Sequence, residues 1–343
     1  MALRDAAEFF IVYSILDKRD TPARQAYHAR CKRRWGRATA VFCLLIALII
    51  TPWRTSAAPS EPITGGSRTN RTQPHAMHTP APVPLPANLD IPSYKAGPLP
   101  FHDGETLIYQ GSWMNLPAAQ SRVTVHRDRK DPQMWVGEMW INSGKLVDVL
   151  YRMRDYIRED FIDGSLQPDD IYISQHEKTR RDEWRVTFDH NEHLVTAIRK
   201  NRQGRTWVRR FSEGDPFGPF SGAMMALTQP LKVGQTLTFD VFSGGNRYVF
   251  SFPVTGRDRV TTALGTFDTL RIEPSVLWLS QGDFRKQARA TTIWVTDDGR
   301  HLPVRIESAA YVGTIRADLV QVIGATQTPT KAQSADAAKQ TDR

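Results

Sequence analysis

Short runs of alternating apolar and polar residues, separated by turn sequences, recur along the chain from residue 101 to 324. At 189–192, for example, Asp-His-Asn-Glu separates an apolar run at 186–188 from another at 194–199. A period of two places successive side chains on opposite faces of a strand, and short turns of this kind join antiparallel neighbours. The pattern predicts a mainly β fold: an antiparallel curved sheet that forms a sandwich or an open barrel.

One or two short helices are expected to interrupt the strands. Residues 146–153 fit one face of a helix, but they also fit the period of a strand, so both alternatives stay open. Residues 221–227 form the other expected helix. The strands are expected at 106–113, 122–126, 134–141, 186–188, 194–199, 206–211, 236–242, 247–254, 257–262, 266–273, 291–295, 303–307 and 313–322.

The N-terminal region carries the pattern of an export segment. A basic cluster precedes the long apolar run at 38–50, and small residues follow it near Ala57. That order is typical of a secretion signal that is cleaved, and it also fits an uncleaved signal anchor. We expect residues 38–53 to be the signal or signal-anchor segment. Residues 1–37 form a basic extension, either a cytoplasmic segment or the product of a wrongly assigned translation start.

Composition divides the rest of the chain into three parts. Residues 54–100 are rich in proline and in small polar residues, which predicts a disordered, semi-rigid spacer. Residues 101–324 form the predicted β-domain. Residues 325–343 are polar and are expected to be a disordered tail.

The net charge of +9 does not indicate a nucleic-acid-binding protein. Residues 1–37 hold nine basic and four acidic residues, whereas the chain from residue 58 holds 35 and 32, a net of only +3. Both cysteines, Cys31 and Cys43, lie in the N-terminal region. The predicted exported part therefore has no disulfide, thiolate zinc site or thiol nucleophile.

No motif in the sequence identifies a catalytic or metal site. His190 and His193 lie three residues apart beside Asp189 and Glu192, which fits either two metal ligands on a helix or a polar hairpin turn. Paired catalytic acids require a defined separation in space that sequence does not supply. We therefore assign no catalytic residues, no metal ligands and no cofactor, and leave ligand-binding residues unknown. The adjacent acidic pairs are Asp169-Asp170, Asp182-Glu183 and Asp297-Asp298.

Basic clusters and tryptophans are the remaining features of interest. The basic residues fit either a solvated strand face or a surface for anionic envelope polymers or lipid headgroups. Trp135 and Trp140 are five apart, so on one regular strand they face opposite sides, and at most one belongs to the core by that criterion. The smaller basic cluster is Lys178, Arg180 and Arg181; the larger is Arg199, Lys200, Arg202, Arg205, Arg209 and Arg210.

Several segments together resemble a known family of bacterial exported proteins, domain of unknown function 3108. The most specific is Trp-Val-Thr-Asp-Asp-Gly-Arg-His-Leu-Pro-Val at 294–304. The resemblance covers about residues 101–323 and implies an exported, mostly β domain of the cell envelope. It supplies no catalytic or binding residues to carry over. The other matching segments are 105–111, 163–168, 231–234 and 264–267, with Gly313 beyond.

These features favour an exported cell-envelope protein without enzymatic activity. We expect a periplasmic location, either tethered to the inner membrane by residues 38–53 or released after signal cleavage. The β-domain would be a binding or structural module for an apolar, glycan or protein envelope component, with lipid, glycan or an envelope protein as partner and no nucleic acid. The alternative is a periplasmic hydrolase or lyase that acts on envelope glycan or lipid.

Overall fold

The computed structural model describes residues 91–324, apart from 213, 280–284, 288–289 and 311–312. These residues all belong to one of the chain's two compact units, Ala40–Arg343. The predicted extension, membrane segment and tail lie outside the described residues, as does the predicted spacer up to residue 90. No helix in the described ranges has both the length and the apolar character needed to span a membrane.

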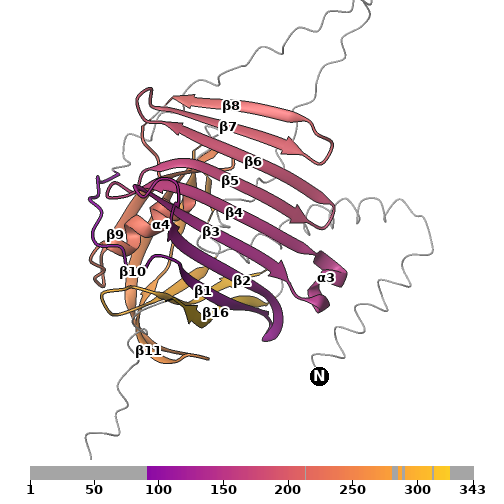
Figure 1. The fold of residues 1–343 in the computed structure, drawn as a ribbon. Helices are drawn as coiled ribbons and strands as arrows, with labels where there is room; N and C mark the ends of the chain where they lie inside the picture. The colour runs from indigo at the N-terminus through magenta and orange to yellow at the C-terminus, as the bar shows by residue number, and fades with distance from the viewer. Residues whose placement is uncertain (1–90, 213, 280–284, 288–289, 311–312, 325–343) are drawn as a thin grey trace, which may run out of the picture. The chain divides into compact units, whose positions relative to one another are not determined.

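An antiparallel meander of eight strands forms one half of a single large curved sheet (Figure 1). Each strand pairs with the next along the chain, which is the simplest route for short runs joined by tight turns. The strands are β1 (Glu105–Trp113), β2 (Leu116–Arg127), β3 (Met134–Ser143), β4 (Met153–Ile162), β5 (Pro168–Glu177), β6 (Arg180–Asp189), β7 (Leu194–Asn201) and β8 (Thr206–Ser212).

The sheet continues from β1 in the other direction, through strands from the C-terminal part of the chain. β1 pairs with β16, and the order runs on through β15, β14, β11 and β10. The long β10 pairs with β11 through its C-terminal half and with β9 and β12 through its N-terminal half. These strands are β9 (Thr236–Ser243), β10 (Asn246–Thr262), β11 (Gly265–Ile272), β12 (Ser275–Trp278), β13 (Arg285–Gln287), β14 (Thr291–Thr296), β15 (Pro303–Ala309) and β16 (Thr314–Ile323).

Among the described residues, two short helices lie near opposite ends of the strands β3 and β4 (Figure 1). Helix α3 (Lys145–Tyr151) connects β3 to β4, and helix α4 (Pro219–Thr228) packs against β4 and β9. The ring of Phe220 in α4 lies on Gly137 of β3, where an added Cβ would come within 2.6 Å of it. A glycine at this point therefore allows the helix to approach the sheet closely.

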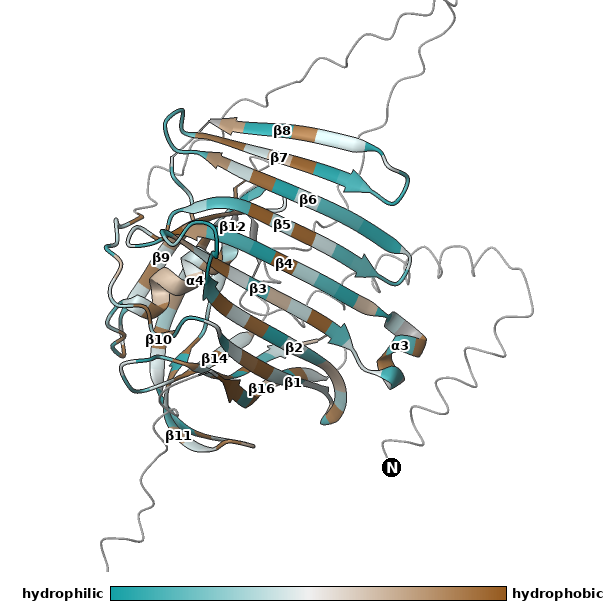
Figure 2. Cartoon of the chain, viewed as in Figure 1, coloured by the Kyte–Doolittle hydropathy of each residue, from teal (hydrophilic) through white to brown (hydrophobic). Residues whose placement is uncertain are grey.

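The strands have an inner face that is buried and an outer face that is partly exposed. β4 alternates strictly between buried and half-buried positions along its length, and Figure 2 shows the corresponding bands of apolar and polar residues. The inner face packs against α4, β9 and β10 in one hydrophobic core. Phe161, Phe220 and Phe267 are almost fully buried there, and each such side chain contributes about 2–3 kcal/mol by leaving water.

The structure confirms the predicted fold class: the described part of the chain is mostly antiparallel β, with one large open curved sheet and two helices. Residues 145–151 are helical, and Met153 already belongs to β4. The prediction of separate strands at 247–254 and 257–262 was wrong, because the chain passes through a register shift at Val254–Gly256 rather than a turn and continues as β10.

Sequence analysis also missed four strands, β4, β5, β12 and β13. β4 and β5 escaped because their buried positions include acidic and amide side chains, so the apolar alternation is broken. Residues 91–100, at the end of the predicted spacer, contact the β-domain. Tyr94 packs on Phe239 with ring centroids 4.6 Å apart, and its hydroxyl accepts a hydrogen bond from the Thr238 N–H.

Candidate functional site

The two histidines of the metal hypothesis lie in a hairpin turn, as the alternative interpretation predicts. His190 Nε2 lies 2.8 Å from the Pro168 carbonyl oxygen, and His193 Nδ1 lies 3.1 Å from Asp215 Oδ1. Within the described ranges, no group of three or more His, Cys, Asp or Glu side chains has an arrangement that could hold a metal ion.

The acidic pair Asp182-Glu183 is divided between the two faces of β6. Asp182 points inward and is buried, while Glu183 is exposed on the outer face. Asp182 accepts a two-pronged hydrogen bond from Arg199, at 3.1 and 3.0 Å, and also pairs with Arg180. This carboxylate therefore neutralises two arginines of the predicted basic clusters at the edge of the core.

A buried pair of acids on the inner face was not predicted from sequence. Asp155 of β4 and Glu177 of β5 are 6% and 7% exposed. Burial, and then repulsion from Glu177, raises the pKa of Asp155 to about 8. The hydroxyl of Tyr151 donates to Glu177 at 2.7 Å, and the N–H of His176 donates to Asp155 at 3.0 Å.

Glu159 is a second buried acid that sequence analysis missed. Its carboxylate accepts hydrogen bonds from the backbone N–H groups of Phe220 (2.6 Å) and Ser221 (2.9 Å), at the first turn of α4. It therefore caps a helix that lies about sixty residues further along the chain, where otherwise unpaired N–H groups and the helix dipole favour an anion. Burial nevertheless raises its pKa to about 7.

Strand alternation also divides the larger basic cluster. Arg199 lies on the inner face between two indoles, with its guanidinium carbon 5.4 Å from the ring centre of Trp184 and 5.1 Å from that of Trp207. Arg209 is also on the inner side and reaches the Gly245 carbonyl at 3.5 Å. The neighbouring residues in sequence, such as Lys200 and Arg210, are exposed on the outer face.

An aromatic strip, which we define as Trp140, Tyr156 and Tyr172, crosses the outer face of β3, β4 and β5. Their ring centroids lie 4.8 Å apart for the first pair and 6.1 Å for the second. All three side chains are half-buried. Trp135, by contrast, is buried on the inner face, so the prediction that the two tryptophans of β3 point in opposite directions is confirmed.

Polar side chains border the strip on the same face. The Tyr156 hydroxyl donates to Glu138 at 2.6 Å, and Arg158 pairs with Asp160 at 2.8 Å. The pKa of Tyr156 is raised mainly by desolvation and to a smaller extent by the hydrogen bond to Glu138. The strip therefore offers stacking surfaces next to carboxylate and guanidinium groups, and it lies on a sheet face outside the core.

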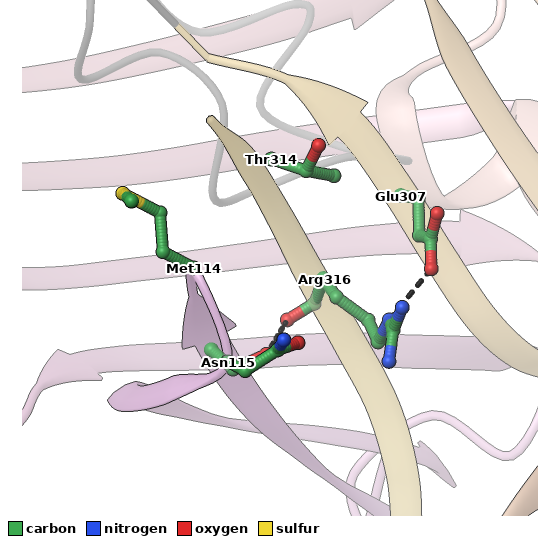
Figure 3. Close-up of a pocket in the computed structure, with 6 residues that line it drawn as sticks. Met114, Asn115, Glu307, Thr314 and Arg316 are labelled. Carbon is green, nitrogen blue, oxygen red and sulfur yellow. Dashed lines mark hydrogen bonds and ion pairs between the residues drawn. The ribbon is translucent and has the colours of Figure 1, made fainter. Parts of the chain in front are cut away.

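A small open pocket of about 260 Å³ lies beside the β1–β2 turn (Figure 3). Met114 and Asn115 form this turn with positive φ angles of 50° and 64°. The pocket's one guanidinium, Arg316, is already paired with Glu307 at 2.6 Å. Its lining is mostly polar, which makes it a weaker binding candidate than the aromatic strip.

Comparisons with known proteins extend the family resemblance but identify no ligand. A family model described as "Protein of unknown function (DUF3108)" matches residues 108–320. No curated protein matches the chain.

The solved structures that match include three with low sequence identity to this chain. A beta-barrel-like protein of the domain of unknown function DUF1849 from Brucella abortus is 6% identical, with a TM-score of 0.40 over 64% of this chain and 97% of that one. A candidate lipoprotein from Parabacteroides distasonis is 10% identical, with a TM-score of 0.31 over 68% and 100%. A candidate exported protein with a YmcC-like fold from Bacteroides fragilis is 10% identical, with a TM-score of 0.26 over 67% and 99%.

Proposed function

The chain belongs to the DUF3108 family, and from its structure we propose that its β-domain is a non-enzymatic module that binds a glycan of the cell envelope. Two features of the sequence support a location of the protein in the cell envelope. The basic and apolar order around 38–53 is that of an export segment, and the proline-rich stretch that follows would hold the domain away from a membrane.

The aromatic strip is the observation that carries the proposal. Trp140, Tyr156 and Tyr172 come from three adjacent strands and form one surface of half-buried rings. A group of adjacent aromatic side chains on the solvent-facing side of a sheet is more informative than a single exposed apolar residue. The C–H face of a sugar ring packs on such rings, while its hydroxyls need hydrogen-bond partners. Glu138 and Arg158 provide carboxylate and guanidinium groups beside the strip.

A lipid surface is a poorer match to the same face. Insertion into a membrane would bury the carboxylates of Glu138 and Asp160 beside the rings, at a large desolvation cost. The same carboxylates are strong acceptors for sugar hydroxyls. Charge and hydrogen-bonding capacity therefore favour a glycan.

The buried acids give less support to the enzymatic alternative. A general acid needs direct contact with its substrate, or contact through one water. Asp155 and Glu177 are buried on the inner face, and Glu159 is engaged in capping α4. The raised pKa values of Asp155 and Glu159 follow chiefly from burial within the fold, so we assign these buried acids to stability.

The test is binding of the full-length chain, purified in mild detergent, to an array of bacterial cell-wall and surface glycans, followed by calorimetric titration of the hits. Trp140→Ala should weaken binding by about ten- to thirtyfold, as expected for an interface hot spot. Trp113→Ala is the matched control, because this tryptophan is 38% exposed but lies at the β1–β2 turn, away from the strip.

Two results would overturn the proposal. One is the failure of the wild-type chain to bind any glycan on the array. The other is a Trp140→Ala variant that binds as tightly as the wild type. Binding to phospholipid vesicles without glycan binding would replace the glycan with a membrane surface.

A further inference from the structure

We propose that the bound glycan is anionic and that its negative groups bind a basic patch beside the aromatic strip. We define this patch as Arg185, Lys200 and Arg210, on the outer face of β6, β7 and β8. The inference rests on the proposed function, because the strip supplies the sugar-stacking surface next to which the charges would bind.

The patch is continuous with the strip. Tyr172 of β5 and Arg185 of β6 are direct cross-strand partners in the sheet, so their side chains stand next to each other on the outer face. The same row continues through Ile198 of β7 and Val208 of β8. Lys200 lies two residues along β7 from Ile198, and Arg210 lies two residues along β8 from Val208, on the opposite side of the row. Five strand spacings separate β3 from β8, or about 24 Å, which a chain of several sugars can span.

The charges of the patch are poorly neutralised by the protein. Arg185 is 64% exposed, and its ion pair with Asp170 is long, at 3.9 Å. Among the described residues, Lys200 and Arg210 make no ion pair within 4.0 Å, although Glu183 lies across the strand from Lys200. On the inner face, by contrast, Asp182 neutralises Arg180 and Arg199.

Protection of a sheet edge explains only part of this arrangement. β8 is the last strand of the meander, and basic residues on an edge strand discourage pairing with other chains. Arg185 lies two strands in from that edge and Lys200 one strand in, where neither is needed for this purpose. A surface of exposed cations, of which only Arg185 has an ion pair and that a long one, matches a sugar polymer that carries carboxylate or phosphate groups when it lies beside stacking rings.

The test compares two glycans with the same linkage and different charge. The neutral probe is the β-1,4-linked hexamer of N-acetylglucosamine. The anionic probe is a peptide-free cell-wall glycan strand of similar length, in which alternate sugars carry a lactyl carboxylate. A third arm uses vesicles containing anionic phospholipid. All are titrated calorimetrically into the full-length chain in mild detergent, at 50 mM and 500 mM salt.

The anionic strand should bind about tenfold more tightly than the neutral hexamer at low salt, which corresponds to two or three exposed ion pairs. This advantage should shrink at high salt, where screening acts over a few ångströms. The double substitution Lys200→Gln and Arg210→Gln should remove most of the advantage and leave binding of the neutral hexamer unchanged. Arg257→Gln with Arg259→Gln removes two exposed cations from β10 and controls for the net charge.

The outcomes separate this inference from the proposed function. Equal affinity for the two glycans would overturn the anionic ligand and leave glycan binding intact. Absence of binding to both, and to the array, would overturn the proposed function and this inference with it. The double variant at Lys200 and Arg210 could also lose binding of the neutral hexamer while its melting temperature stays unchanged. That result would overturn the inference that the patch binds only the negative groups of the glycan. Patch-dependent vesicle binding without glycan binding would replace the glycan by a membrane.

Discussion

Replacing Glu159 with glutamine should flatten the pH dependence of the protein's stability. This carboxyl group is fully buried and caps α4 through the N–H groups of Phe220 and Ser221. Its pKa is raised from an ordinary value of 4.5 to about 7, chiefly by burial. The folded protein therefore holds this proton more tightly than the unfolded chain does.

The sign and size of the effect follow from that difference. The stability contributed by the protonated group is complete below pH 4.5 and is lost as the pH rises through about 7. At 1.36 kcal/mol per pKa unit, ionisation should cost about 3 kcal/mol of unfolding free energy between pH 4 and pH 8. Glutamine does not ionise. It leaves one N–H of α4 poorly satisfied, but that cost of about 1–3 kcal/mol is the same at every pH.

The measurement is urea unfolding of the full-length chain, followed by tryptophan fluorescence at a series of pH values from 4 to 8. The difference in unfolding free energy between Glu159→Gln and the wild type should move in the variant's favour by about 3 kcal/mol across this range. Asp155, whose pKa is also raised, titrates in both proteins, and its effect therefore cancels in the difference. Ile157→Val, on the same face of β4, changes no ionisable group and should shift stability equally at every pH.

A constant difference between Glu159→Gln and the wild type from pH 4 to pH 8 would refute this reasoning. It would mean that the two N–H groups of α4 stabilise the carboxylate enough to offset its burial.

Three further changes probe the inner face. Asp155→Asn should gain stability relative to the wild type as the pH rises through about 8, because the raised pKa makes ionisation of Asp155 costly in the fold; chemical unfolding at pH 5 and pH 9 checks this, and a fixed difference would contradict it. Gly218→Ala should cost about 1–3 kcal/mol, since its Cβ would lie 2.3 Å from Glu159 Oε1; an unchanged melting temperature would show that the cap can move. Asp182→Ala should cost about 2 kcal/mol by leaving Arg180 and Arg199 without their shared carboxylate; the double variant with Arg199→Met should recover part of that loss.

The sequence by itself determined the local structure wherever turn residues separate apolar strands. The turn at 189–192 and the hairpin at 243–246 follow from residue types that adopt tight turns, and the strands on either side follow from the period of two. The opposite orientations of Trp135 and Trp140 follow from their spacing alone. These properties depend on neighbours in the chain, so a single sequence contains them.

The tertiary structure decided which side of each strand is buried and which distant residues meet. Arg199 and Lys200 are adjacent in sequence, yet one is paired with Asp182 at the edge of the core and the other lies on the outer surface. β4 was hidden because Asp155 and Glu159 occupy inward positions that an apolar pattern would fill. Such acids can be buried only because partners from elsewhere in the fold bind them.

The candidate site depends on register in the same way. Trp140, Tyr156 and Tyr172 are spaced sixteen residues apart in the sequence, a regularity that signals one surface only when β4 and β5 are known to lie between tight turns. The antiparallel meander then brings these rings side by side and places Arg185 next to the last of them. Long-range pairing between strands is a property of the whole sheet, and short-range patterns do not specify it.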